Sequence, residues 1–124
     1  MITLHHTTTS GDLPTETFTI MFGGQKVGEC QLRHRPRKSD NLPDGFENHI
    51  YYEIDPEFQG KGYAKEALRL ILDEARKIHL AEVILSVAET NIPSQKVMES
   101  QGAELLEKAQ AKDGTWQRKY KIIL

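Results

Sequence analysis

Runs of hydrophobic positions predict two antiparallel strands within residues 15–33. Gly23-Gly24 suits a primed hairpin turn, and residues 26–32 resume the strand pattern after it. Residues 34–45 hold two prolines, several charges and many turn formers, so we expect a loop there. The basic side chains at its start are typical of a solvated hairpin tip, although they could also meet an anionic ligand: Arg33, Arg35, Arg37 and Lys38.

Residues 46–54 alternate between apolar and polar positions, which predicts a half-buried strand. Its apolar face should pack on a core. Its other face is too polar to be buried without a purpose. The apolar face comprises Ile50, Tyr52 and Ile54, and the polar face comprises Glu47, His49, Tyr51 and Glu53.

The hydrophobic period changes to 3.6 from residue 63 to residue 79, which predicts a helix with one continuous apolar stripe. The apolar segment 82–88 has the length of a buried strand. The two strands and the intervening helix are expected to form a parallel β-α-β unit with a right-handed crossover. A short helix over 93–101 and a hairpin at Asp113-Gly114 complete a mixed α/β (α+β) fold.

Size and composition narrow the class of protein. The chain has 124 residues and is expected to form a single domain, residues 1–124. A net charge of -2 gives no electrostatic reason to expect nucleic acid or an anionic membrane as a partner. The sequence holds neither a secretory signal nor an apolar run long enough to span a membrane, so we expect a cytoplasmic protein.

Cysteine and histidine give no sign of metal binding. Cys30 is the single cysteine, which excludes an internal disulfide and a cysteine-based zinc cluster. We interpret it as a small core residue. His5 and His6 lack ligand partners at metal spacing, so they are expected to lie in a mobile terminus. No metal is predicted.

The junction between the strand at 46–54 and the long helix is the most informative segment, with the sequence Gln59-Gly-Lys-Gly-Tyr-Ala64. Two glycines allow a tight turn whose N–H groups face one point, and the helix dipole adds positive potential there. This predicts a cradle for a phosphate or pyrophosphate. The Walker pattern does not fit. A dinucleotide site is a minor alternative, in which Glu89 would bind the ribose, but Lys65 occupies its third glycine position.

The same segment, together with residues 90–103, resembles the GCN5-related N-acetyltransferase (GNAT) family over about residues 46–106. It is most similar to the branch that acts on ribosomal-protein N-termini and small amines. The resemblance implies a single GNAT-like domain whose two parallel strands splay apart and whose N-terminal helices are shortened or absent. It also implies direct transfer of acetyl from acetyl-CoA to a primary amine, on a small molecule or a protein N-terminus.

The resemblance assigns cofactor roles by position. Backbone groups near Tyr52, Glu53 and Ile54 would pair with the pantetheine arm of CoA. Asn91 would hydrogen-bond that arm or serve only as a turn or capping residue, and Ser94 would line the same groove. The amides that would hold the pyrophosphate belong to Gln59, Gly60, Lys61, Gly62, Tyr63 and Ala64.

The catalytic residues are less well defined. Glu47 and Glu53 could each act as base or bind the amine, or be ordinary exposed strand residues. Met98 stands where many family members have a proton-donating tyrosine, and Ser86 where others have a glutamate, so Tyr51 or water would have to substitute. An inactive acyl-CoA-binding or interaction module is the alternative. The short N-terminal part leaves the acceptor pocket open or completed by a second copy, so a homodimer is possible.

Overall fold

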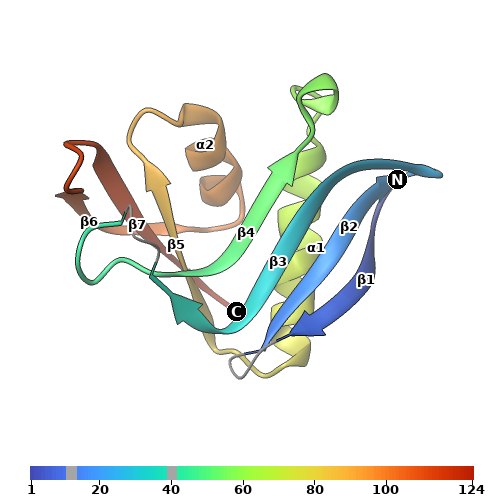
Figure 1. The fold of residues 1–124 in the computed structure, drawn as a ribbon, viewed down its shortest axis with the longest axis horizontal. Coiled ribbons are helices and arrows are strands. Elements are labelled where there is room, and N and C mark those ends of the chain that lie inside the picture. Colours follow the sequence, from blue (N-terminus) through green and yellow to red (C-terminus); the bar gives the residue numbers. More distant parts are fainter. Residues whose placement is uncertain (11–13, 39–41) are drawn as a thin grey trace.

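The computed structural model describes residues 1–10, 14–38 and 42–124. Figure 1 shows a V-shaped molecule, with a sheet in each arm and the long helix α1 behind one of them. The elements in chain order are β1 (Ile2–Ser10), β2 (Thr15–Phe22), β3 (Gln25–Arg37), β4 (Asn48–Ile54), the 3-10 helix η1 (Pro56–Phe58), α1 (Tyr63–Lys77), β5 (Glu82–Ala88), α2 (Ile92–Ser100), β6 (Glu104–Gln110) and β7 (Trp116–Ile123).

Strands β1 to β4 form an antiparallel sheet in sequence order. The predicted hairpin is present as β2 and β3. The N-terminal segment, by contrast, is a strand rather than a mobile terminus: His5 lies opposite Thr19, and the His6 ring packs edge-on against Phe18 at 5.2 Å between centroids. An open edge of β2 offers unpaired backbone groups, and β1 pairs with them.

The predicted loop at 34–45 is shorter than expected, because β3 continues to Arg37, which pairs with Asn48 of β4. The register of β3 against β4 is irregular between Leu32 and Arg37, and Pro36 lies in that stretch. Proline has no N–H to donate and is tolerated where pairing is irregular. Residues 39–41 of the predicted loop lie outside the described residues.

Helix α1 buries the predicted apolar stripe against the first sheet (Figure 1). Its buried side chains join residues of both sheets in one hydrophobic cluster, which fixes the two arms of the V relative to each other. The stripe comprises Ala67, Leu68, Ile71, Leu72 and Ala75.

The second sheet has the strand order β5-β7-β6, and all its pairs are antiparallel. Tyr120 of β7 is its largest fully buried side chain. Strand β6 is an outer strand and is exposed along most of its length, with Leu105 and Leu106 each 44% exposed. Trp116 at the start of β7 is 51% exposed.

Strands β4 and β5 run side by side in the same direction (Figure 1), but they belong to different sheets. Side chains of β4 replace the missing hydrogen-bond ladder. The backbone N–H of Ser86 donates to Asn48 Oδ1 at 2.6 Å, and that of Ile84 donates to His49 Nδ1 at 2.9 Å. Within the described ranges, the hydrogen bonds that join β4 to β5 in the expected splayed β-α-β unit therefore lie near the start of β4.

The polar face predicted for this strand is not exposed at His49, whose relative exposure is only 7%. Its ring is buried for a physical reason: the imidazole acts as the hydrogen-bond partner that Ile84 would otherwise lack. Burial lowers the pKa of the His49 imidazole and so favours the neutral, accepting form, while Glu47 and Glu82 act in the opposite direction.

Candidate functional site

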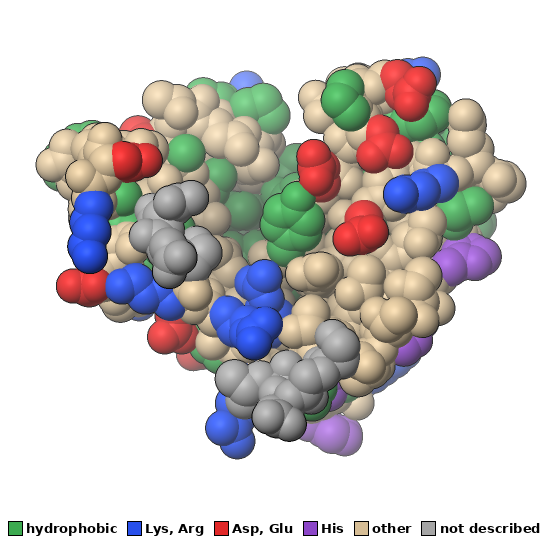
Figure 2. All heavy atoms as spheres, in the orientation of Figure 1, with side chains coloured by type: hydrophobic (Ala, Val, Ile, Leu, Met, Phe, Trp, Pro, Cys, Tyr) green, Lys and Arg blue, Asp and Glu red, His purple; other side chains and the backbone are tan. Residues whose placement is uncertain are grey.

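Two adjoining cavities lie between the arms of the V, where β4 and β5 diverge. Figure 2 shows the molecule hollowed on this side, between the two arms. The first cavity is about 510 Å³ and reaches the loop before α1; the second is about 710 Å³ and lies over β3, β4 and β5. Tyr52, Asn91 and Ser94 line both cavities and so form the junction between them.

Unpaired backbone amides distinguish the loop at the first cavity. None of the N–H groups of Gly60 to Ala64 donates a hydrogen bond within the described ranges. Gly60 and Gly62 have φ of 80° and 82°, a backbone conformation that residues other than glycine rarely adopt. Because these N–H groups also open α1, they combine donors with the positive end of the helix dipole. These are the features that the prediction of an anion cradle requires.

Most of the predicted cofactor residues come together here. Those that line the first cavity are Tyr52, Ile54, Gln59, Gly60, Gly62, Tyr63, Ala64, Asn91 and Ser94. Lys61 does not line the cavity and is exposed at the tip of the loop. The Tyr63 ring stacks on Phe22 at 5.0 Å between centroids, which anchors the start of α1 to β2.

Gln59 and Asn91 have structural roles in the loops that border this cavity. The Gln59 side-chain amide donates to the Ile54 carbonyl at 2.9 Å and closes the loop onto the end of β4. Asn91 Oδ1 accepts from the Ser94 N–H at 3.3 Å, so Asn91 caps α2, as one of the two alternatives predicted. The nitrogen of the same amide is the group that could donate to a ligand.

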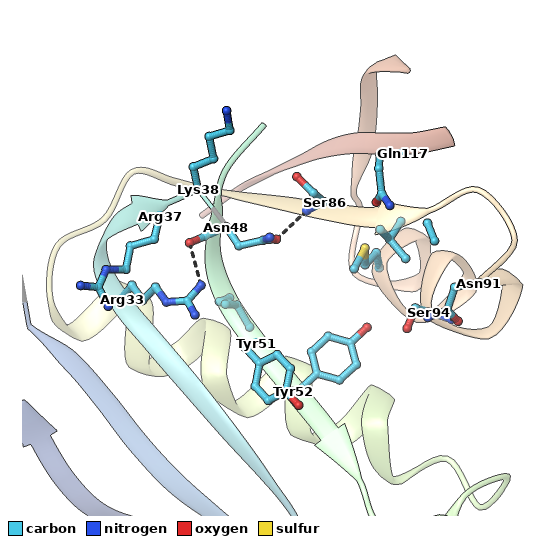
Figure 3. Close-up of a pocket in the computed structure, with 14 residues that line it drawn as sticks. Arg33, Arg37, Lys38, Asn48, Tyr51, Tyr52, Ser86, Asn91, Ser94 and Gln117 are labelled. Carbon is cyan, nitrogen blue, oxygen red and sulfur yellow. Dashed lines mark hydrogen bonds between the residues drawn. The ribbon is translucent and has the colours of Figure 1, made fainter. Parts of the chain in front are cut away.

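The Tyr52 side chain was predicted to pack on the core, and it does so in part, but its hydroxyl was not predicted to face a ligand. Its hydroxyl is buried without a hydrogen-bond partner in the described chain, and Figure 3 shows the ring reaching from β4 toward α2. Burial raises the pKa of the Tyr52 phenol. The Ser94 side chain lies close enough to offset part of this rise but does not meet the geometry of a hydrogen bond. A buried, unpartnered hydroxyl at the junction of two cavities is available to a ligand.

The two glutamates predicted as catalytic lie apart: Glu47 immediately precedes β4, and Glu53 lies near its end. Glu53 lines the first cavity, and its Oε2 accepts from the Tyr51 hydroxyl at 2.6 Å. This bond raises the pKa of the Tyr51 phenol. Glu47 lines neither cavity; its backbone carbonyl accepts from Ser86 Oγ at 3.2 Å. Ser86 and Met98 both line the second cavity.

Basic side chains enter the second cavity from the end of β3, as Figure 3 shows. Arg33 Nη1 donates to the Asn48 carbonyl at 3.3 Å, and Lys38 pairs with Asp44 at 2.7 Å. The sequence analysis favoured a solvated tip for this basic run. The structure instead places Arg33, Arg37 and Lys38 in the cavity wall because β3 is longer than predicted, whereas Arg35 lines neither cavity.

The dinucleotide alternative loses its ribose-binding acid. Glu89 forms a two-pronged ion pair with Arg118, at 2.7 and 2.9 Å, and also contacts Lys108 at 3.2 Å. These partners, Arg118 first, lower the pKa of the Glu89 carboxyl to about 2. Glu89 therefore ties β5 to β6 and β7 rather than facing a ligand.

Metal chemistry and thiol chemistry find no support in the described residues. No cluster of three or more His, Cys, Asp or Glu side chains that could hold a metal occurs among them. Cys30 is fully buried, as predicted, and burial raises the pKa of its thiol to about 12. None of the described helices has the length and apolar character needed to cross a membrane.

A family model for the acetyltransferase (GNAT) domain matches residues 5–104. The chain therefore belongs to the GNAT acetyltransferase family, as the two sequence blocks predicted. No curated protein sequence matches it.

Solved structures share the fold at low sequence identity. A GNAT acetyltransferase from Elizabethkingia anophelis with acetyl-CoA bound has a TM-score of 0.70 at 12% identity. The match covers 99% of this chain and 98% of that structure's chain. The ribosomal-protein-S18-alanine N-acetyltransferase from Escherichia coli has a TM-score of 0.69 at 17% identity, over 92% and 71% of the two chains. A GNAT acetyltransferase from Bacillus anthracis has a TM-score of 0.65 at 23% identity, over 86% and 65%. The chain spans less than two thirds of several such structures, 62% to 65%.

Proposed function

We propose that residues 1–124 work as one N-acetyltransferase domain that moves an acetyl group from acetyl-CoA to a primary amine by direct transfer in a ternary complex. The observation that supports this most is the row of unpaired amides from Gly60 to Ala64 at the start of α1. They border a cavity that joins a second one at Tyr52, so a cofactor and an acceptor can meet there.

The residues fit acetyl-CoA in two places. The backbone amides of the loop, which includes Lys61, would hold the pyrophosphate of acetyl-CoA. Strand β4 would hold the pantetheine arm through backbone groups on the edge that faces away from β3. Since the Ile54 carbonyl is on that edge and bonds Gln59, the two-residue period of a strand puts the N–H and C=O of Tyr52 there too. The Asn91 amide nitrogen would donate from the opposite side of the junction.

Bound acetyl-CoA would supply a thioester whose carbonyl carbon the amine attacks, and the carbon–sulfur bond then breaks. The chain supplies the proton transfers. We propose that the Glu53 carboxylate, directly or through water, takes the proton that the ammonium must lose. Glu47 remains a weaker candidate because it lies outside both cavities. The Tyr52 hydroxyl would give a proton to the departing sulfur. It would thereby take the role of the tyrosine that many family members have at the position of Met98.

A titration followed by an activity assay tests this function. Acetyl-CoA should bind in a calorimetric titration, and free thiol should then be released when an amine from a diverse panel is added. Binding without turnover on any amine would favour the second candidate, an inactive acyl-CoA-binding module, which Met98 and Ser86 support. The absence of any binding would contradict both candidates.

We also propose a cytoplasmic location and a homodimer. The support for the dimer is the exposed outer strand β6, where unpaired backbone groups and two leucines face solvent. The acceptor would be a small amine or a peptide N-terminus. The Escherichia coli neighbour is named for an alanine of a ribosomal protein, and this chain shares its fold.

A further inference from the structure

Two arginines meet in the wall of the second cavity without a carboxylate between them. Arg33 is half-buried, and its Nε is buried with no hydrogen-bond partner among the described residues. Arg37 lines the same cavity beside Arg33, on β3 (Figure 3). Burial lowers the pKa of the Arg33 guanidinium, and the charge of Arg37 lowers it further. Two like charges in a partly desolvated wall favour an anion that both can contact.

Lys38 adds a third positive charge that can be recruited. Its partner, Asp44, has a side chain that is 96% exposed, and such surface ion pairs contribute little free energy. Within the described residues, neither Arg33 nor Arg37 forms an ion pair with a carboxylate. The wall thus presents donors suited to two-pronged recognition of a carboxylate or phosphate.

Beyond the junction of the two cavities, the part of the first cavity that Glu53 lines is acidic. Glu53 lies opposite Glu29 across β3 and β4, and both act on the neighbouring Tyr51 hydroxyl in the direction expected of negative charges. Tyr51 lies two to three residues along β4 from the positions beside the arginines, which corresponds to roughly 7–10 Å along a strand. An acceptor with an ammonium at one end and an anion at the other matches both ends.

We infer that the acceptor amine carries an anionic group, a carboxylate or a phosphate, which Arg33 and Arg37 bind while the ammonium faces Glu53. This inference rests on the proposed transferase function and adds the chemical class of its substrate. It also predicts discrimination against polyamines, because their second cation would lie against the arginines.

Matched acceptor pairs test the inference, with acetyl-CoA held at saturation. β-Alanine is compared with its amide, phosphoethanolamine with ethanolamine, and the peptide amide Ala-Asp with Ala-Asn. We expect the anionic member of at least one pair to have the lower KM. The pairs distinguish a free carboxylate, a phosphate and an acidic peptide as sources of the anion.

Arg37→Glu is the informative variant, and Arg35→Glu is its matched control. Both arginines are exposed on β3, so both variants should fold, whereas Arg33 is too buried to be a safe choice. Arg37→Glu should raise KM for the anionic acceptor by about tenfold to a hundredfold. It should leave the affinity for acetyl-CoA unchanged and lower KM for a diamine. Arg35→Glu should change neither KM by more than about threefold, the range of weak surface pairs.

Equal KM values within every pair, or equal effects of the two variants, would overturn the inference even if acetyl transfer occurs. Should no amine be acetylated, the anion site is tested by calorimetry with the same acceptors and no turnover. Weaker binding of β-alanine or phosphoethanolamine to Arg37→Glu than to Arg35→Glu would then support the site although the proposed function had failed. Equal binding would refute the site.

Discussion

Single residues at the junction of the cavities combine structural and chemical roles. Asn91 caps α2 with its oxygen and keeps its nitrogen for a ligand, and Gln59 holds the end of β4 in place. The Tyr52 hydroxyl has no hydrogen-bond partner among residues 1–10, 14–38 and 42–124. A polar atom buried without a partner costs free energy, about 1–3 kcal/mol, and a ligand that pairs with it recovers that energy.

Replacing Tyr52 with phenylalanine should lower kcat by about tenfold to a hundredfold. This is near or below the smallest rate enhancement typical of general acid catalysis, because a thiolate is already a tolerable leaving group. Acetyl-CoA affinity, measured by calorimetry, should stay the same because the backbone groups of residue 52 are retained. An unchanged kcat would exclude the hydroxyl as the proton donor.

Gly62→Glu should weaken acetyl-CoA binding by about a hundredfold or more, because a carboxylate would stand where the amides are proposed to meet pyrophosphate. Gly102→Glu is the matched control. The two glycines have φ of 82° and 83°, and in both an added side chain meets open space, so the backbone strain is alike. Calorimetry should show an affinity loss only at Gly62. Equal losses in both variants would mean that the loop is only a turn.

At the scale of elements, the decisive feature is the contact between β4 and β5. Two side-chain acceptors, Asn48 and His49, stand in for a ladder over a short stretch, and beyond it the strands are free to diverge. Gly28 of β3 works at the other edge of β4: a side chain there would overlap the Glu53 carbonyl, so only glycine allows this close approach. The edge of β4 that faces β5 leaves space for the cavities, and the edge that faces β3 holds β4 in place.

The pH dependence of stability tests the contribution of His49. Its pKa is lowered in the folded state, so the folded protein binds fewer protons than the unfolded chain. Its stabilising contribution is complete above the unfolded value, 6.5, and is lost as the pH falls below it toward the lowered folded value.

His49→Phe should cost about 1–3 kcal/mol of unfolding free energy near neutral pH, because the Ile84 N–H loses its acceptor. The difference between wild type and variant should shrink as the medium is acidified, which denaturant titrations at two pH values can measure. A difference that does not change with pH would contradict a neutral, accepting His49.

At the scale of the whole molecule, one core holds two sheets between which the described residues form no backbone hydrogen bonds, so the notch is a consequence of the architecture. The architecture also determines where the charged side chains lie. A chain with a net charge of -2 still gathers basic side chains on one wall of the notch, as Figure 2 shows at the centre of the molecule.

The outer strand β6 makes the proposed dimer testable. Light scattering should report twice the monomer mass at micromolar concentration, and Leu106→Glu should shift the protein toward the monomer. Leu106 is 44% exposed, so the substitution should leave the fold intact, as circular dichroism can check. A monomeric wild type at high concentration would exclude the homodimer.

The sequence by itself determined the features that depend on neighbours along the chain. The 3.6 period predicted α1 to within about two residues at its C-terminal end, and the glycine spacing predicted the tight turn before it. Both follow from local backbone geometry, so neighbouring residues suffice to define them. The burial of Cys30 was predicted for a similar reason, since its residue type and strand position are both read locally.

Only the tertiary structure decided what depends on contacts distant in sequence. His49 is buried because Ile84, 35 residues away, needs an acceptor. Tyr52 joins two cavities because α2 lies across from β4, and Arg37 lines the second cavity because β3 continues past its expected end. Alternation along a strand gives the face on which a residue lies, but not what that face meets. That depends on how the two sheets pack, which no local pattern encodes.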